Sequence, residues 1–155
     1  MNELSDPEED YRKLYNHCVG FAMQMLADKQ AFYPFGAKIN ADGSLGAVGA
    51  NSGEQHPAPD VLLEILTAGL SEEVLAGKIR ACCLCFDGKW QSAKDAAKSD
   101  VIMCIMEHRA ENAMQFVVPY SVTAGAAPTI EQPIARRLMA KNFPWSASPG
   151  ASSSQ

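Results

Sequence analysis

The N-terminal segment of the chain has apolar side chains at the spacing of an α-helix. They recur every three or four residues and therefore share one broad face: Tyr11, Leu14, Tyr15, Cys18, Phe21, Ala22, Met25 and Leu26. The stretch Asp6-Pro7-Glu8-Glu9 precedes them. It combines a capping residue, a proline suited to the first helical position and acidic side chains that favour the positive end of a helix. The pattern predicts a helix from about Pro7 to about Lys29.

An aromatic stretch around a proline, FYPFG, follows this helix. Pro34 cannot donate a backbone hydrogen bond and biases Tyr33 away from helical dihedral angles, so the chain becomes extended here. The residues after it predict a β-hairpin with its turn at Asp42-Gly43. Two roles stay open for the rings, either as anchors of the core or as walls of a pocket or interface. Tyr33 and Phe35 are therefore candidate binding residues.

The rest of the chain alternates helical and extended patterns. A second helix is predicted from Pro59 to Gly77, with Gly69 and Ser71 as places where it could divide. Strands are expected at about 79–86, 100–108 and 113–120, and the last two form a hairpin around 109–112. A final helix is predicted from about Ile130 to Lys141, with Pro133 near its start.

These elements follow one another in the order α-β-β-α-β-β-β-α. Runs of two and three strands with short links favour antiparallel pairing. The predicted fold class is therefore α+β, an antiparallel sheet of about five strands with helices packed on it. Residues 1–145 are predicted to form a single domain. Residues 146–155 are small, polar and rich in Pro, Gly and Ser, which predicts a disordered tail.

The three later strands carry apolar side chains on both faces. A one-sided antiparallel sheet should alternate between apolar and polar positions, so a second cover is needed. Three arrangements could bury the second face of the sheet: a helix on each face, a second subunit, or a ligand pocket lined by Met and Cys. We expect the first two helices to share one face and a homodimer to bury the remainder. Met103 or Met106, whichever faces away from the helices, is the expected interface residue.

Composition limits the partner and the compartment. The chain has 155 residues, of which 47% are hydrophobic and 20% charged, and its net charge is −5. That sign repels phosphate backbones and anionic lipid, so nucleic acid is not an expected partner. No apolar run is long enough to span a membrane and no signal peptide is evident, so we predict no membrane association and a cytoplasmic location. The five cysteines are predicted to be reduced.

Two short stretches carry residue types that can bind a metal or transfer a proton. Cys82-Cys83-Leu84-Cys85 lies in a predicted strand, without the turn that a zinc knuckle uses, and no second Cys/His pair follows nearby, so we predict buried core thiols and neither a metal nor a cofactor. Glu107-His108-Arg109 offers an acid, a base and a cation, and a solvated strand end is the expectation there. The alternative is a pocket near Glu107, His108 and Tyr120. With no nucleophile elbow and no phosphate loop, no catalytic residue is predicted.

Four short motifs occur together: FYPFG, IRA (Ile79–Ala81), EHR (Glu107–Arg109) and PY (Pro119 and Tyr120). In this combination the chain resembles a group of small bacterial proteins of uncharacterised function, and the resemblance touches most of the domain. It implies a bacterial origin and a single domain, and it assigns no activity. The order of elements is separately similar to that of roadblock and profilin-like domains.

The apolar strand faces dominate the functional prediction. They indicate a non-catalytic homodimer that binds a partner protein or a small apolar ligand. The alternative is a small enzyme that acts on a small molecule. A deep pocket with converging polar groups would favour the enzyme, and a flat apolar face would favour the binding protein.

Overall fold

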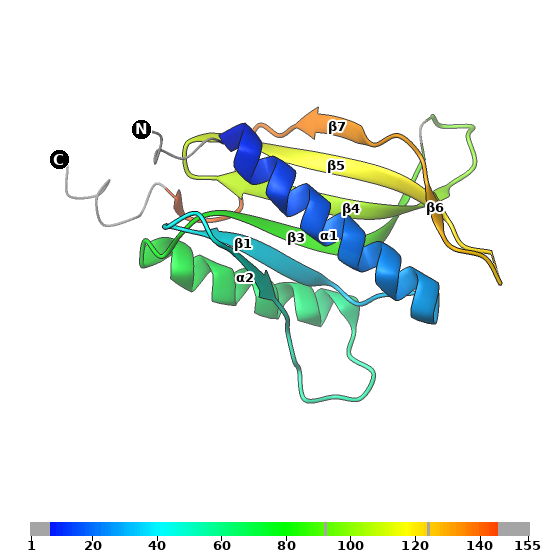
Figure 1. Cartoon of the computed structure of the whole chain (residues 1–155), viewed down its shortest axis with the longest axis horizontal. Helices are drawn as coiled ribbons and strands as arrows, with labels where there is room; N and C mark the ends of the chain where they lie inside the picture. The colour runs from blue at the N-terminus through cyan, green and yellow to red at the C-terminus, as the bar shows by residue number, and fades with distance from the viewer. Residues whose placement is uncertain (1–6, 92, 124, 146–155) are drawn as a thin grey trace.

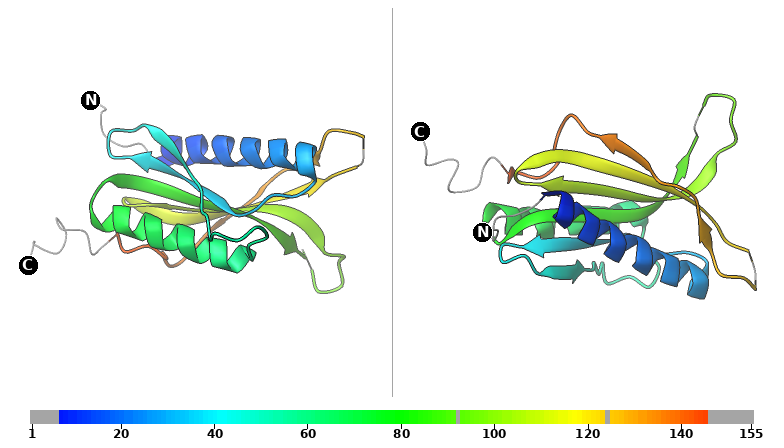
Figure 2. Two further views of the ribbon diagram at one scale, coloured as in Figure 1. Left: turned by 90° about the horizontal axis from the view of Figure 1, so that it is seen from below. Right: turned by 45° about the horizontal axis from the view of Figure 1, so that its top comes forward.

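A single antiparallel sheet with one helix on each face forms the described part of the computed structural model (Figures 1 and 2). The structure describes residues 7–91, 93–123 and 125–145, so the predicted tail at 146–155 and the proposed cap at Asp6 lie outside it. The helices are α1 (Pro7–Lys29) and α2 (Pro59–Leu75). The strands are β1 (Phe35–Asn40), β2 (Leu45–Val48), β3 (Ile79–Trp90), β4 (Ser99–His108), β5 (Glu111–Ser121), β6 (Thr129–Ile130) and β7 (Ile134–Arg137). The predicted α+β class is confirmed.

The long strands β3, β4 and β5 form the centre of the sheet. The strand order is β2-β1-β3-β4-β5-β6, and β7 also pairs with β5. The predicted β1–β2 hairpin is present, and at its turn Asp42 Oδ1 accepts hydrogen bonds from the Ser44 amide (2.9 Å) and hydroxyl (2.6 Å). The chain then crosses through α2 to β3, which therefore lies beside β1.

The C-terminal elements differ from the helix predicted at 130–141, and that prediction is wrong. β6 and β7 are short strands that pair with two different parts of β5. Ile130 and Ile134 would have supplied the apolar stripe of such a helix, but each belongs to a strand. Pro133 lies between the two strands. It favours an extended residue before it and lacks the amide that a helix would use, which accounts for the difference.

α1 covers one face of the sheet with the stripe predicted from its spacing. Leu14, Cys18, Ala22 and Leu26 are fully buried along it. The strand residues beneath are mostly small, which lets the helix approach the sheet closely: Ala37, Ala81, Cys83, Cys85 and Cys104. All five cysteines are free and buried, as predicted for core thiols.

α2 packs on the opposite face, so the prediction that both helices share one face is wrong (Figure 2). Its buried stripe lies against Cys82 and Leu84 of β3: Leu66, Leu70 and Val74. The helix does not divide at Gly69. It ends before Gly77, whose φ of 73° is the left-handed conformation common just after a helix. Cys82 and Leu84 point away from α1, so both faces of β3 need apolar residues.

Gly36 in β1 is a position where a methyl group has no room. A Cβ there would lie 2.9 Å from the backbone oxygen of Cys83 on the neighbouring strand. We expect Gly36→Ala to lower the free energy of unfolding by about 1–3 kcal/mol, because a backbone atom of the sheet must move. The same substitution at Gly69, where nothing lies within 4 Å, should instead stabilise α2 slightly. Urea unfolding of both variants tests the contrast, and equal effects would contradict it.

Candidate functional site

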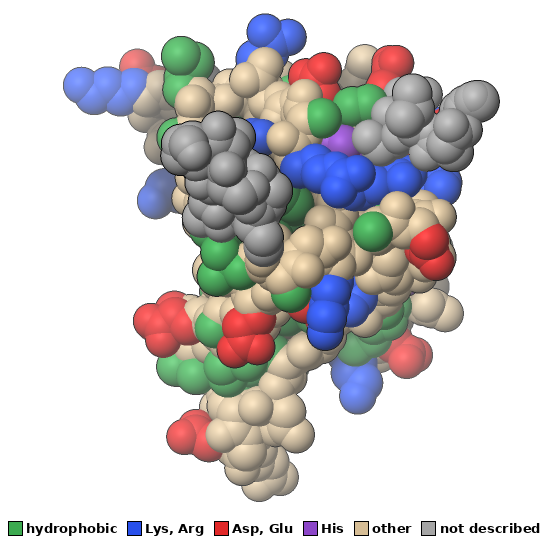
Figure 3. Space-filling model, turned by 90° about the vertical axis from the view of Figure 1, so that its left-hand side faces the viewer, with side chains coloured by type: hydrophobic (Ala, Val, Ile, Leu, Met, Phe, Trp, Pro, Cys, Tyr) green, Lys and Arg blue, Asp and Glu red, His purple; other side chains and the backbone are tan. Residues whose placement is uncertain are grey.

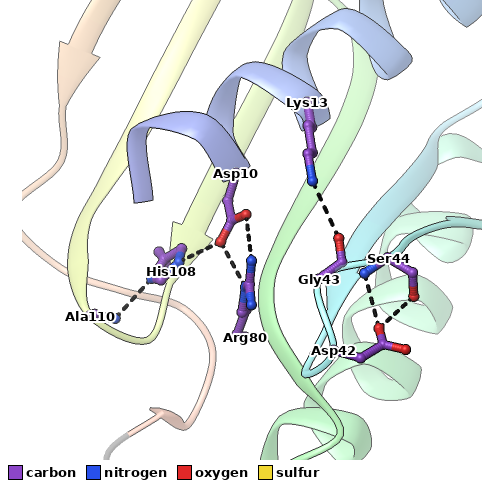
Figure 4. Close-up of polar contacts among 8 residues, drawn as sticks. All are labelled: Asp10, Lys13, Asp42, Gly43, Ser44, Arg80, His108 and Ala110. Carbon is purple, nitrogen blue, oxygen red and sulfur yellow. Dashed lines mark hydrogen bonds and ion pairs between the residues drawn. The ribbon is translucent and has the colours of Figure 1, made fainter. Parts of the chain in front are cut away.

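Three polar side chains meet inside the protein beneath the first turns of α1 (Figure 4). Asp10 comes from α1, Arg80 from β3 and His108 from β4. The Arg80 guanidinium donates to Asp10 through Nε (2.9 Å) and Nη2 (3.0 Å), a two-point ion pair. His108 Nε2 lies 2.9 Å from Asp10 Oδ2. Asp10 and His108 are fully buried and Arg80 is 9% exposed, so this Asp10 network is held almost entirely out of water.

The two hydrogen bonds of His108 fix its protonation state. The Ala110 amide donates to Nδ1 (3.0 Å), so Nδ1 carries no proton and Nε2 donates to Asp10. Burial lowers the pKa of His108, and the hydrogen bond to Asp10 opposes this only in part. Burial alone would raise the pKa of Asp10, but hydrogen bonds from Arg80 and His108 outweigh it and lower the pKa. The network therefore holds a neutral imidazole beside an ionised carboxylate.

Glu107 has a separate set of partners on the other face of the sheet. Its carboxylate accepts hydrogen bonds from the amides of Asn142 (2.5 Å) and Phe143 (3.1 Å) and from Trp145 Nε1 (2.9 Å). Phe143 and Trp145 pack with the apolar stripe of α2. Glu107 thus fastens the segment that follows β7 against the sheet.

The expectation of a solvated strand end at Glu107 and His108 is therefore wrong, because both side chains are fully buried. Segments distant in sequence cover this end of β4. Lys and Arg side chains gather on the outer surface here (Figure 3). Lys13 donates to the Gly43 backbone oxygen (3.4 Å) and Lys141 to that of His108 (2.6 Å). These contacts tie α1, the β1–β2 turn and the C-terminal segment to one end of the sheet.

The sequence-predicted site residues do not meet in one pocket. Glu107 and His108 point to opposite faces, and His108 pairs with Glu111 at the start of β5. Tyr120 lies near the end of β5, where its hydroxyl donates to Asp87 (2.8 Å). The structure therefore separates the members of the proposed enzyme pocket.

The two aromatic candidates have different environments. Phe35 is 8% exposed and packs edge-to-face on Phe21 and Phe32, so it anchors the core. Tyr33 is 50% exposed, so its ring is accessible to a partner. A binding role for Tyr33 stays a prediction.

Asp10 and Arg80 are site residues that the sequence reasoning did not identify. Asp10 stands four residues before Leu14, on the buried face of α1, and this placement of a charge was the available signal. Arg80 follows Ile79 at the start of β3. Its partner lies 70 residues away in the chain, so no local pattern connects the two.

A second feature is an apolar area on the α2 side of the sheet that α2 does not cover, named here the open face. Its members are buried Val101, Met103 and Val117 with partly exposed Phe86, Trp90, Ile105 and Gln115, and with Ile134 and Arg136 of β7. Arg136 lies over the Trp90 ring, 5.7 Å from its centroid. Trp90 Nε1 is enclosed and has no hydrogen-bond partner among the described residues. Met106 faces α1 and is fully buried, so Met103 is the methionine that faces the open side.

A third feature is a groove of about 770 Å³ between α1 and the β5–β7 edge, named here the edge groove. Aromatic and apolar side chains form much of its wall, with charged groups among them: Pro7, Glu8, Tyr11, Arg12, Tyr15, Glu111, Asn112, Met114, Phe116, Pro133 and Arg137. Neither Glu107, His108 nor Tyr120 lines it. The volume is in the range of ligand sites.

Two of the buried thiols lie close together on neighbouring strands. Cys85 and Cys104 Sγ lie 3.8 Å apart across β3 and β4. Yet in residues 7–145, leaving out positions 92 and 124, no three His, Cys, Asp or Glu side chains are placed to hold an ion. Burial raises the pKa of Cys82 well above its usual value, which favours the protonated thiol.

Comparisons of the chain with protein-family models, with curated proteins and with solved structures find no match. The bacterial origin implied by the four motifs therefore stays a prediction. Within the described part of the chain, neither helix is long and apolar enough to cross a membrane.

Proposed function

We propose that the protein is a non-catalytic interaction protein that assembles as a two-fold homodimer through the open face. The observation that carries this proposal is the partial exposure of Phe86, Trp90 and Ile105 beside one another on one face of the sheet. Contiguous apolar surface of this kind is typical of interfaces.

The hydrogen bonds of the buried acid and base support a role without catalysis. Both oxygens of Glu107 accept from the C-terminal segment, and both nitrogens of His108 are engaged by Asp10 and Ala110. A general acid or base must reach a substrate atom, which these two groups cannot do without partial unfolding. Five free buried thiols fit a reducing compartment, which supports a cytoplasmic location.

The proposed dimer brings the same surface of two copies together. In a two-fold interface each residue meets the partner's copy of the same patch, so Met103 and Ile105 lie near the axis. A stable interface should bury at least about 1,000 Å² in total and be rich in Met and aromatic side chains. The open face has this composition, whereas the exposed residues of α2 are mixed with charges.

Ile105→Asp should convert the dimer to monomer, because a carboxylate would be desolvated in the interface without a partner. Ile105 is preferable to Met103, which is only 9% exposed and whose replacement by Asp also endangers folding. Met139→Asp is the matched control, since it adds the same charge at a side chain that is 98% exposed. Sedimentation velocity reports the mass of each variant, and circular dichroism confirms its folding.

The wild type and Met139→Asp should sediment as dimers and Ile105→Asp as a folded monomer. A wild-type monomer at high micromolar concentration would refute the homodimer and favour a domain that acts alone. A dimer that survives Ile105→Asp would place the interface on another surface. Native mass spectrometry of the same samples reports any retained ligand.

A further inference from the structure

The geometry points to a second binding surface: we propose that the outer edge of β7 and the adjoining edge groove bind an extended acidic segment of a partner protein. The segment pairs with β7 as an added strand and packs one large apolar side chain against the rings of Tyr15 and Phe116. This mode of recognition combines main-chain hydrogen bonds with a side-chain pocket. It uses a surface distinct from the open face and does not depend on the homodimer.

β7 is a sheet edge without a neighbour on its outer side. In the described part of the chain it pairs with β5 alone, and all four of its residues are exposed. Figure 1 shows β7 at the margin of the sheet, with nothing of the described chain beyond it. An uncovered strand edge offers a row of unpaired amides and carbonyls to another chain.

The ladder between β5 and β7 shows which backbone groups are free. The Leu138 amide donates to the Ala113 carbonyl (2.8 Å), so the position just after β7 points inward to β5. Antiparallel residues alternate in direction along a strand, and Arg136 therefore also points inward. The amides and carbonyls of Ala135 and Arg137 then face outward. These two residues can accept an added strand without loss of any bond to β5.

The side chains of the same two residues lie on the groove side. Arg137 lines the edge groove, and Ala135 pairs with Phe116, another lining residue. A neighbouring strand lies about 4.8 Å away, and Ala135 is small. A long apolar side chain on the added strand can therefore cross Ala135 and reach the rings of Tyr15 and Phe116, which already contact each other edge-to-face (5.3 Å).

Charge selects the kind of segment. β7 carries adjacent arginines in a chain whose net charge is −5. Arg136 contacts Gln115 and Trp90, but Arg137 has no hydrogen bond or ion pair with a described residue. An acidic side chain opposite Arg137 would gain a bidentate pair at the groove rim. A second copy of β7 is a poor occupant, because pairing would gather four guanidinium groups on one short ladder.

Selection from a displayed library of random peptides about eight residues long identifies the ligand without a prior choice of sequence. The bait is the full-length chain, and enriched peptides are synthesised with a fluorescent label for anisotropy titration. We expect them to be acidic, free of proline at the centre and to share one aromatic or large aliphatic position. Peptides with no acidic preference would overturn the proposal.

Three variants then test the geometry of binding. Ala135→Pro removes the outward amide and spares the inward pairs, so affinity should fall at least about tenfold while the melting temperature changes little. Arg137→Glu should cost a similar factor. Lys98→Glu is the matched control, since it makes the same change in charge at an exposed position outside the edge groove and the open face, and it should have a much smaller effect. Equal losses in Arg137→Glu and Lys98→Glu would show general attraction only and would overturn strand addition.

Amide hydrogen exchange by NMR keeps the test decisive if Ala135→Pro fails to fold. On peptide binding to the wild type, the amides of Ala135 and Arg137 should become protected. Unchanged exchange at both positions would exclude pairing along β7. Repeating the titration with Ile105→Asp separates the two proposals, since peptide affinity should persist whether or not the homodimer forms.

Discussion

Replacement of Asp10 by alanine should lower the free energy of unfolding by about 3–5 kcal/mol, which is the usual cost of removing one partner from a buried ion pair. The change leaves the Arg80 guanidinium almost buried without its carboxylate, and it leaves the Nε2 proton of His108 without an acceptor. Both groups would have to find water inside the protein or pull their strands apart.

Asp28→Ala is the control, because Asp28 lies on the same helix and is exposed. A change of about 0.5 kcal/mol or less is expected there. Urea unfolding at neutral pH measures both variants. If Asp10→Ala lowered the free energy of unfolding no more than the control does, the Asp10 network would make no net contribution to stability. The presence of the network would then have to be explained by a role outside folding.

The pH dependence gives an independent readout of the same network. The pKa of His108 is lowered from its ordinary 6.5, so the unfolded chain binds the proton more readily and stability falls as pH drops below about 6.5. The pKa of Asp10 is lowered from 3.8, so its contribution is present above that value and is lost as pH falls further. The stability difference between the wild type and Asp10→Ala should therefore shrink in acid. A difference that stays constant with pH would contradict an ionised Asp10.

Local patterns in the sequence predicted what local forces determine. The spacing of apolar residues from Tyr11 to Leu26 placed α1 correctly because a helix is a local structure. Asp42-Gly43 identified the first hairpin for the same reason. The apolar residues on both faces of β3 correctly indicated two covers, but they could not say which helix takes which face. That choice is set by the β2–α2–β3 crossover, which is a property of the whole sheet.

The candidate site escaped prediction because its parts are far apart in the chain. Asp10 and His108 are separated by 98 residues, and Glu107 meets its partners 35 to 38 residues later. The motif EHR was correctly noticed, but as polar residues near a turn it indicated exposure. Nothing in the neighbouring sequence shows that α1 and the C-terminal segment cover this end of β4. Polar residues at a strand end are ambiguous until the elements that pack over them are known.

Glu107→Ala should be nearly as damaging as the loss of Asp10, with a decrease of about 3–5 kcal/mol in the free energy of unfolding. The carboxylate accepts from two backbone amides and from the Trp145 indole, and Phe143 and Trp145 are both buried. With the acceptor gone, the segment loses its charge-assisted hydrogen bonds, and its donors would be buried without partners for as long as the segment stayed docked. The apolar contacts of the segment with Cys82 and Leu84 favour docking, but the free-energy cost of burying unpaired donors opposes it.

Release of this segment has a spectroscopic signature that a general loss of stability lacks. The chain has two tryptophans, so a Trp90→Phe background leaves Trp145 as the sole indole reporter. Under native conditions the emission of Glu107→Ala in this background should shift to longer wavelength, because Trp145 moves into water while α1 and the sheet stay folded. Glu64→Ala, at an exposed position of α2, is the matched control and should leave the emission unchanged. An unshifted spectrum in a destabilised Glu107→Ala protein would mean that apolar packing holds the segment and that the carboxylate acts only on the strand end.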